Sequence, residues 1–398
     1  MLERRVWLDF AAVTTSVALL GLGLGSTLPL TALVLTARGY GPGLVGWMAA
    51  ATALGGALAT FAAPRATRVL GRRRVMLGCL LLAAASVIPL QFVVAPAAWF
   101  VLRFVFGMAM APLFVLGEAW INVLPGDAVR GRVIAIYTTC FTACQVAGPL
   151  LTDWLSAFPD ITFVLCGALF LVGAPGILIA RDAPGEAPSA GPAATAKQHA
   201  TSWLGILCLA PAIIAGTVFF AAFDTVIFTF LPLVALAAGQ GQGRALAAAS
   251  LVFLGDAALQ FAAGWLADRY GRHRAHRCCG IALCLLLPLL PWLIDSRPAW
   301  EIYLFLLGGV AGAIYTLSLV ACGERFSGAA LLRASGLIAL SWNVGSCAGG
   351  AATGLLMQRF GPSWMVSVLC GLALLFLLAL RAEPRPAPLA RAAPASGR

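Results

Sequence analysis

Long apolar segments recur along almost the whole chain. Segments of about 20 largely uncharged residues begin near residues 8, 44, 75, 99, 133, 160, 207, 244, 277, 300, 334 and 363. This is the length that an α-helix needs to cross the hydrocarbon core of a bilayer. Gly, Pro and charged residues separate the segments, as expected for turns. We therefore predict an all-α membrane protein with twelve transmembrane helices.

The composition agrees with this class of protein. Hydrophobic residues make up 61% of the chain and charged residues only 10%, whereas soluble domains carry about 25% charged residues. The first segment, from about Trp7 to Leu35, is longer than the apolar region of a signal peptide, so we predict that it is retained. The net charge of +11 could indicate nucleic-acid binding. The basic residues lie in short loops between apolar segments, so we expect a lipid bilayer as partner and no nucleic acid.

The distribution of Lys and Arg predicts the orientation. With the N-terminus inside, the basic residues on the outer side are only Arg38, Arg244, Arg297 and Arg359. Arg103 lies within a segment, and the other Lys and Arg residues fall on the inner side. Positive charge accumulates on the cytoplasmic side of membrane proteins. We therefore predict a multi-pass protein of the bacterial inner (plasma) membrane with both termini in the cytoplasm.

A polar stretch divides the chain into two halves. Residues 181–202 are rich in Pro, Ala and Gly and lack apolar periodicity, so we predict a cytoplasmic linker there. It separates an N-terminal six-helix bundle, residues 1–180, from a C-terminal six-helix bundle, residues 203–381. We expect residues 382–398 to form a disordered cytoplasmic tail.

Short sequence matches relate the two halves. The matching pairs are Leu28-Pro29-Leu30 with Leu231-Pro232-Leu233, Gly71-Arg72 with Gly271-Arg272, Gly117-Glu118 with Gly323-Glu324, and Cys166-Gly167 with Cys370-Gly371. All four occur in the same order at nearly constant spacing. Parallel repeats of six helices are a transporter architecture, with the substrate site near the midplane between the halves.

The chain lacks the usual signals of cofactor or metal chemistry. Nearly all of its 11 Cys lie in apolar segments, which indicates no disulfide framework. His199, His273 and His276 fall in segments read as polar loops, without the spacing of metal ligands. There is no Gly-x4-Gly-Lys-Ser/Thr sequence for nucleotide binding. We expect no cofactor, and no membrane-embedded enzyme, because no paired carboxylates occur at helical spacing. Transport would depend on an ion gradient or on the substrate's own gradient.

The most specific motif joins the eighth and ninth segments. It reads Gly264-Trp265-Leu266-Ala267-Asp268-Arg269-Tyr270-Gly271-Arg272-His273-Arg274. Gly264 is expected to let a neighbouring helix approach closely, Asp268 to sit at a helix N-terminus, and Gly271 to permit a tight turn. The segment resembles the loop signature of the major facilitator superfamily. The resemblance implies an alternating-access transporter in which two bundles move around a central site, and we expect a monomer.

The corresponding loop of the first half, Pro64–Arg74, departs from this signature. Pro64 replaces the Gly and Arg68 replaces the Asp. We predict that Glu118 compensates by pairing with Arg68 or Arg72, and that a mirror pair closes the same cytosolic gate. The mirror pair joins Glu324 to Arg272 or Arg333. The alternative is that Glu118 is a solvated charge at a helix end.

Arg103 occupies the fourth segment, four residues before Gly107. This spacing is similar to a helix 4 signature of proton-coupled members of the superfamily, which slightly favours efflux over uptake. Only Gly148-Pro149 remains of the antiporter pattern in the fifth segment. Arg103 is a candidate for proton coupling or substrate binding, and the alternative is that it extends towards the outer boundary.

Two acids lie inside apolar segments. Asp224 is surrounded by uncharged residues from Leu204 to Gly243, which places it near the bilayer midplane. Ionisable residues at that depth are functional candidates, and a carboxylic acid there can exchange a proton. The alternative is a neutral, hydrogen-bonded structural acid. Asp256, followed by Gln260, is the second candidate, with a bracing role towards Asp268 or a neighbouring helix as its alternative.

Neutral polar and aromatic side chains complete the set of candidates. Gln145 and Asn343 can offer hydrogen bonds to a substrate or between helices. The seventh segment carries Phe219, Phe220, Phe223, Phe228 and Phe230, of which some could line an apolar site while most pack. Together these features predict a secondary transporter that moves a small molecule, coupled to protons. The alternative is a non-transporting receptor or scaffold that keeps the fold, which the altered first-half loop permits.

Overall fold

The computed structural model describes residues 4–123, 130–180, 203–326 and 328–383. The first half contains α1 (Arg4–Ala37), α2 (Pro42–Leu70), α3 (Arg72–Val87) continued by the 3-10 turn η1 (Ile88–Gln91), α4 (Pro96–Val123), α5 (Arg130–Leu155), α6 (Thr162–Val172) and α7 (Ala174–Ile179). The second half contains α8 (Trp203–Leu209), α9 (Pro211–Ala237), α10 (Gln242–Tyr270), α11 (Arg272–Leu286), η2 (Leu287–Leu289), α12 (Leu290–Leu293), α13 (Ala299–Arg325), α14 (Gly328–Phe360) and α15 (Trp364–Ala382). These elements form the twelve predicted spans.

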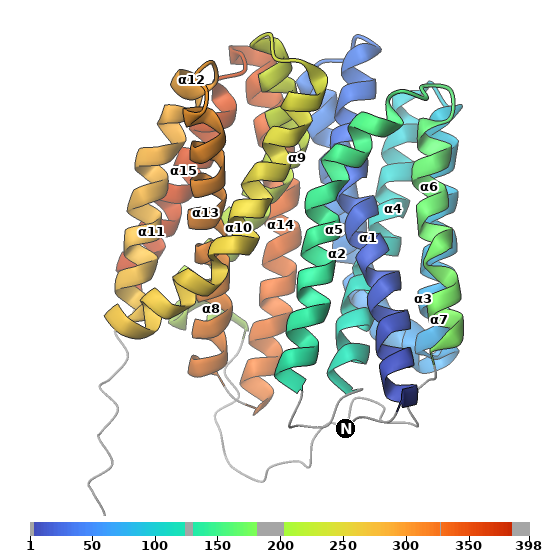
Figure 1. Cartoon of the computed structure of the whole chain (residues 1–398). Coiled ribbons are helices and arrows are strands. Elements are labelled where there is room, and N and C mark those ends of the chain that lie inside the picture. The colour runs from blue at the N-terminus through green and yellow to red at the C-terminus, as the bar shows by residue number, and fades with distance from the viewer. Residues whose placement is uncertain (1–3, 124–129, 181–202, 327, 384–398) are drawn as a thin grey trace, which may run out of the picture.

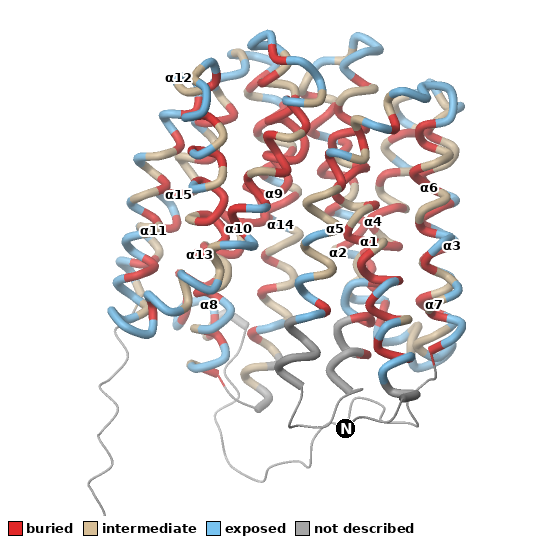
Figure 2. The backbone as a smooth tube through the Cα atoms, in the orientation of Figure 1, coloured by how far each residue is buried: buried red, intermediate tan, exposed pale blue. Residues whose placement is uncertain are grey.

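The helices run side by side along one common direction (Figure 1). Among the described residues, ten spans are long and apolar enough to cross a membrane by length and composition. Helix α9 is the most buried of the ten, and α11 and α15 are among the least buried. Figure 2 shows the buried residues gathered along the inner helices. Helix α9 therefore lies in the protein interior, where a polar side chain would face protein rather than lipid.

Two long helices, α5 and α14, are not among those ten spans, and α14 shows how a less apolar helix is accommodated. It carries Ser341, Asn343 and Ser346 between several glycines, and it packs against α9 of its own half and α2 of the other. Because these faces contact protein, polar residues there do not have to enter hydrocarbon.

The two halves meet tightly through α2 and α14. A Cβ atom on Gly46 would lie 2.3 Å from the carbonyl oxygen of Gly350. On the opposite side, α10 contacts α5, where Ser250 Oγ donates a hydrogen bond of 2.7 Å to the Val146 carbonyl and Gln242 Nε2 lies 3.4 Å from Asp153 Oδ1. Gln242 begins α10 at the end of the bundle predicted to face outward. The halves therefore contact each other at this end.

The predicted cytosolic end of α10 is different. Nothing lies within 4 Å of a Cβ atom placed on Gly264. The expectation that Gly264 allows close helix approach is wrong for this conformation. The reason is that the side of α10 carrying Gly264 does not face another helix, whereas Ala267 in the same motif packs against Ala275 of α11 and Leu317 of α13.

The internal repeat is confirmed by backbone geometry. Gly71 (φ 82°, ψ 152°) and Gly271 (φ 89°, ψ 132°) make the turns between α2 and α3 and between α10 and α11. Gly39 and Gly239, at the other end of the bundle, both have φ of 84°. Each pair has the same sequence spacing, so the halves share one chain path.

The turn glycines give a direct test of this geometry. Replacing Gly71 or Gly271 by Ala forces a side chain into a backbone region that is almost exclusive to glycine, at a cost of about 1–3 kcal/mol. We expect each variant to unfold at a lower temperature in detergent. Gly78→Ala is the control, because Gly78 lies inside α3 with open space around it. Equal melting temperatures for the three variants would contradict the expectation.

Candidate functional site

Three charged residues lie deep inside the bundle. Asp224 sits in the middle of α9, Asp256 on α10 and Arg103 on α4. Asp224 and Asp256 each keep 8% of their surface exposed, and Arg103 keeps none. Away from the helix ends, the second half thus contributes two buried acids and the first half one buried base; Asp9, near the start of α1, is buried as well.

Asp224 is a buried acid that makes no hydrogen bond with the described residues. Its only electrostatic neighbour among them is Asp256, a second acid. The alternative of a hydrogen-bonded structural acid therefore finds no support in the described part of the chain. Asp224 is thus buried, with 8% of its surface exposed.

Asp256 is held by its own helix and by α13. Its Oδ1 accepts a hydrogen bond of 3.1 Å from Gln260 Nε2, one turn along α10. A Cβ atom on Gly312 of α13 would lie 1.5 Å from the same oxygen. Asp256 does not brace Asp268, which pairs with Arg272 instead. Gly312 was missed at the sequence level, although its four-residue spacing from Gly308 is typical of close helix packing.

Gly312 provides a test of how Asp256 is positioned. In Gly312→Ala the new methyl group overlaps the carboxylate, so Asp256 must move; overpacking typically costs about 1–3 kcal/mol. We expect a lower melting temperature and loss of transport. Gly371→Ala on α15 is the matched control, because nothing lies within 4 Å of that position. If both variants behave alike, Gly312 has no positioning role.

Arg103 is completely enclosed within the first half. Its guanidinium carbon lies 5.0 Å from the centre of the Phe106 ring, and none of its three side-chain nitrogens makes a hydrogen bond to a described residue. The alternative that Arg103 extends to the outer boundary is wrong, because its side chain packs into the interior. In this conformation its nitrogens have no accessible surface, so its role in proton coupling or substrate binding stays a prediction.

Asn343 and Gln145 lie on the two central helices α14 and α5. Asn343 Nδ2 donates to the Ala339 carbonyl at 2.9 Å. Its Oδ1 would be 2.8 Å from a Cβ atom on Gly56 of α2, so the amide faces the other half. Gln145 is partly buried, and its backbone packs closely against Gly25 of α1. Both residues are on helices that contact the other half, and their role in substrate binding stays a prediction.

The motif at the predicted cytosolic end of the second half forms an ion-pair cluster. Arg272 lies 3.3 Å from Asp268 and also pairs with Glu324 at the end of α13. Arg269 stacks near the rings of Trp265 and Tyr270, and Arg274 is exposed. The predicted pairing of Glu324 with Arg272 is present. Both residues belong to the same half, so this pair does not itself connect the halves, and a gate role stays a prediction.

The first half uses a different contact at the same place. Arg72 lies over the ring of Trp120, with 5.5 Å between the guanidinium carbon and the ring centre. Arg68 Nε donates to the carbonyl of Pro64 in its own helix at 3.3 Å. The side chain of Glu118 lies outside the described residues, so its predicted pairing with Arg68 or Arg72 is untested. Arg72 therefore makes a cation–π contact, whereas Arg272, its counterpart in the second half, pairs with acids.

The interpretation of the histidines as loop residues needs correction. His273 and His276 belong to α11, and His276 is buried. Its Nε2 lies 3.1 Å from the Ile314 carbonyl oxygen and 3.4 Å from Ser318 Oγ, both on α13. The error arose because the basic residues around His276 look like a loop, whereas α11 already begins at Arg272. No group of three or more His, Cys, Asp or Glu residues suited to a metal ion occurs among the described residues.

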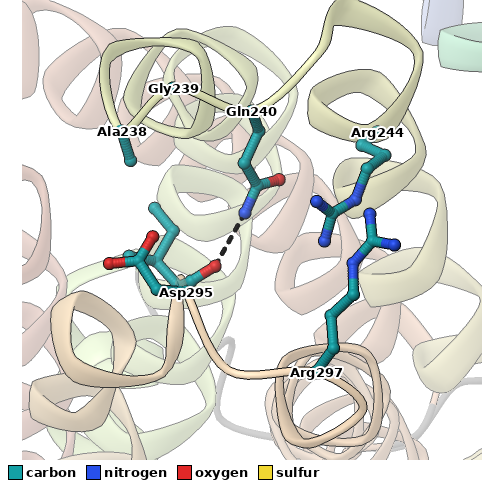
Figure 3. A pocket seen from close by; sticks show the side chains of 7 residues that line it. Ala238, Gly239, Gln240, Arg244, Asp295 and Arg297 are labelled. Carbon is teal, nitrogen blue, oxygen red and sulfur yellow. Dashed lines mark hydrogen bonds between the residues drawn. The ribbon is translucent and has the colours of Figure 1, made fainter.

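A cavity of about 280 Å³ opens at the predicted outer end of the second half (Figure 3). Gln240 Nε2 donates to the Ile294 carbonyl at 2.8 Å along one wall. Arg244 and Arg297 point towards each other across it, and both approach Glu301, at 3.7 and 3.8 Å. None of the three buried charges lines this cavity, so we do not place the transport site there.

The fold, the internal repeat and the buried charges define a secondary transporter architecture. The model of the Major Facilitator Superfamily matches residues 13–250 and 213–397, and the chain belongs to this superfamily of membrane transporters. An uncharacterized MFS-type transporter of Enterobacter sp. (strain 638) is 25% identical over 357 residues, which cover 87% of this chain and 89% of the relative.

Solved structures show the same fold. The nucleoside transporter NupG matches with a TM-score of 0.76 at 15% identity, covering 94% of this chain and 98% of NupG. A D-xylose-proton symporter matches with a TM-score of 0.73 at 14% identity, covering 96% and 98% of the two chains. At these identities the likeness concerns the fold alone.

Proposed function

We propose that this protein is a proton-coupled secondary transporter in which Asp224 carries the coupling proton. The observation that supports this is a carboxyl group in the middle of the most buried helix that has no hydrogen-bond donor among the described residues. An isolated carboxylate in such surroundings costs several kcal/mol. Proton binding removes that charge, and deprotonation restores it when a suitable cation or water is present.

Asp256 supports the same proposal. It lies on the neighbouring helix α10 and interacts electrostatically with Asp224. In a low-dielectric interior two nearby negative charges repel strongly. A proton at either acid therefore changes the field at the other, which gives a simple physical link between proton binding and the packing of α9 against α10.

The proposed direction is efflux rather than uptake. The support is the spacing of Arg103 and Gly107, similar to a helix 4 signature of proton-coupled members of the superfamily, which slightly favours efflux. The D-xylose-proton symporter with the same fold is a proton symporter, so it supports proton coupling but not efflux. We further propose a monomer in the inner membrane with both termini in the cytoplasm. The proposed domain limits are 1–180 and 203–381; the linker 181–202 and most of the tail lie outside the described residues.

The second candidate is a receptor or scaffold that keeps the fold without transport. The first-half loop favours it, because Pro64 and Arg68 replace the Gly and Asp of the signature. Flux into proteoliposomes separates the two functions. Substrate binding without flux, across a broad panel of compounds, would favour the receptor.

Asp224→Asn tests the coupling proposal. Compounds that raise the melting temperature of the purified protein bind the folded state, and a screen of drugs, sugars, organic acids and amino acids supplies a substrate. In everted vesicles that substrate should cause proton movement with the wild type and none with Asp224→Asn, because the amide cannot carry the proton. Asp295→Asn, on the outer surface of the second half, is the control and should keep coupling. Proton movement that survives in Asp224→Asn would exclude Asp224 as the coupling site.

A further inference from the structure

Three aromatic side chains from three helices meet beside Asp224. The ring centres of Phe220 on α9 and Tyr315 on α13 are 5.3 Å apart, and the rings are nearly parallel at 10°. Trp342 on α14 contacts both with its ring inclined by 64°, at 5.9 Å from Phe220 and 5.1 Å from Tyr315. We call Phe220, Tyr315 and Trp342 the aromatic trio.

The aromatic trio faces the interior of the protein. Phe220 is 5% exposed and lies on the most buried span. Tyr315 and Trp342 both touch it, so their rings occupy the sides of α13 and α14 that face α9. Unlike Phe219 and Phe223, which are fully buried, Tyr315 and Trp342 are only partly buried. Tyr315 and Trp342 are therefore not fully enclosed, although both pack against Phe220 of the buried helix α9.

Asp224 lies one helical turn from Phe220 on the same face of α9, about 6 Å along the axis. The segments 205–237, 245–267, 278–293, 302–323, 334–358 and 365–380 of the second half contain no Lys or Arg, and their only acids are Asp224 and Asp256. The first-half helices in contact with α9 carry charge only near their ends: Arg4, Arg5 and Asp9 begin α1, and Arg65 and Arg68 lie in the last turns of α2. Negative charge next to aromatic side chains, without a competing basic side chain in the middle of these helices, is a combination that attracts cations.

On the basis of the proposed function, we infer that the transported substrate is an organic monocation with an apolar or aromatic body. Its positive charge pairs with Asp224, and its body lies against the aromatic trio. A proton and such a cation would compete for one carboxylate. Binding of one requires release of the other, which makes the site suited to exchange of the cation for a proton.

Probes of matched shape and opposite charge test this inference. We expect the purified full-length protein to bind tetraphenylphosphonium and to bind tetraphenylborate at least tenfold more weakly, measured by calorimetry against protein-free micelles. Trp342→Leu and Tyr315→Leu each remove an aromatic face and keep an apolar side chain. A cation–π contact contributes about 0.5–2 kcal/mol, so we expect about two- to thirty-fold weaker binding of the cation in each variant. Asp224→Asn should weaken it at least tenfold.

Two controls separate a lost contact from a lost fold. Trp292→Leu replaces a tryptophan of α12 that is 82% exposed, and it should bind like the wild type. Tyr315→Phe keeps the ring and should retain binding even if Tyr315→Leu unfolds. The inference is overturned if tetraphenylborate binds as tightly as the cation, if Trp342→Leu binds like Trp292→Leu, or if the wild type binds no cation. In each of those cases, proton movement driven by another substrate would leave the coupling proposal intact.

Discussion

Helix backbones approach one another closely in this protein at glycines that recur in both halves. A Cβ atom on Gly107 of α4 would lie 1.8 Å from the Thr52 carbonyl oxygen of α2, and one on Gly308 of α13 would lie 1.7 Å from the Val252 carbonyl oxygen of α10. Within a bilayer the backbone must satisfy its hydrogen bonds inside each helix, and small residues then allow helices to pack tightly. Arg103 on α4 and Asp256 on α10 lie on helices that these contacts hold together.

The two halves share this backbone plan but differ in charge. By the spacing of the repeats, Asp224 corresponds to Gly21, and Asp256 corresponds to Gly56. A Cβ atom on Gly21 would lie 2.6 Å from the Phe141 carbonyl oxygen, so the first half has no room for a side chain there. The acids thus occupy positions where the other half packs helix against helix. The second half therefore carries Asp224 and Asp256, whereas the first half has close helix contacts at the equivalent positions Gly21 and Gly56.

The turns at the predicted cytosolic end also differ in charge between the two halves. In the second half Arg272 joins Asp268 and Glu324, whereas in the first half Arg72 lies over Trp120. Arg272 and Arg72 occupy equivalent positions next to equivalent turn glycines. The turn is therefore common to both halves, while the partner of the arginine differs. The contacts between α5 and α10 close the bundle between the halves at the predicted outer end.

Much of this architecture follows from local sequence. Apolar length determines the twelve spans, the repeated Gly71 and Gly271 determine equivalent turns, and Asp224 is recognisable as a buried acid because no charge surrounds it for many residues. Tertiary structure alone shows that Arg103 is enclosed rather than extended, that Gly312 makes room for Asp256, and that His276 is buried. It also brings Phe220, Tyr315 and Trp342 together from three helices. Hydropathy and turn signals act over neighbouring residues, whereas these contacts depend on which faces of distant helices pack together.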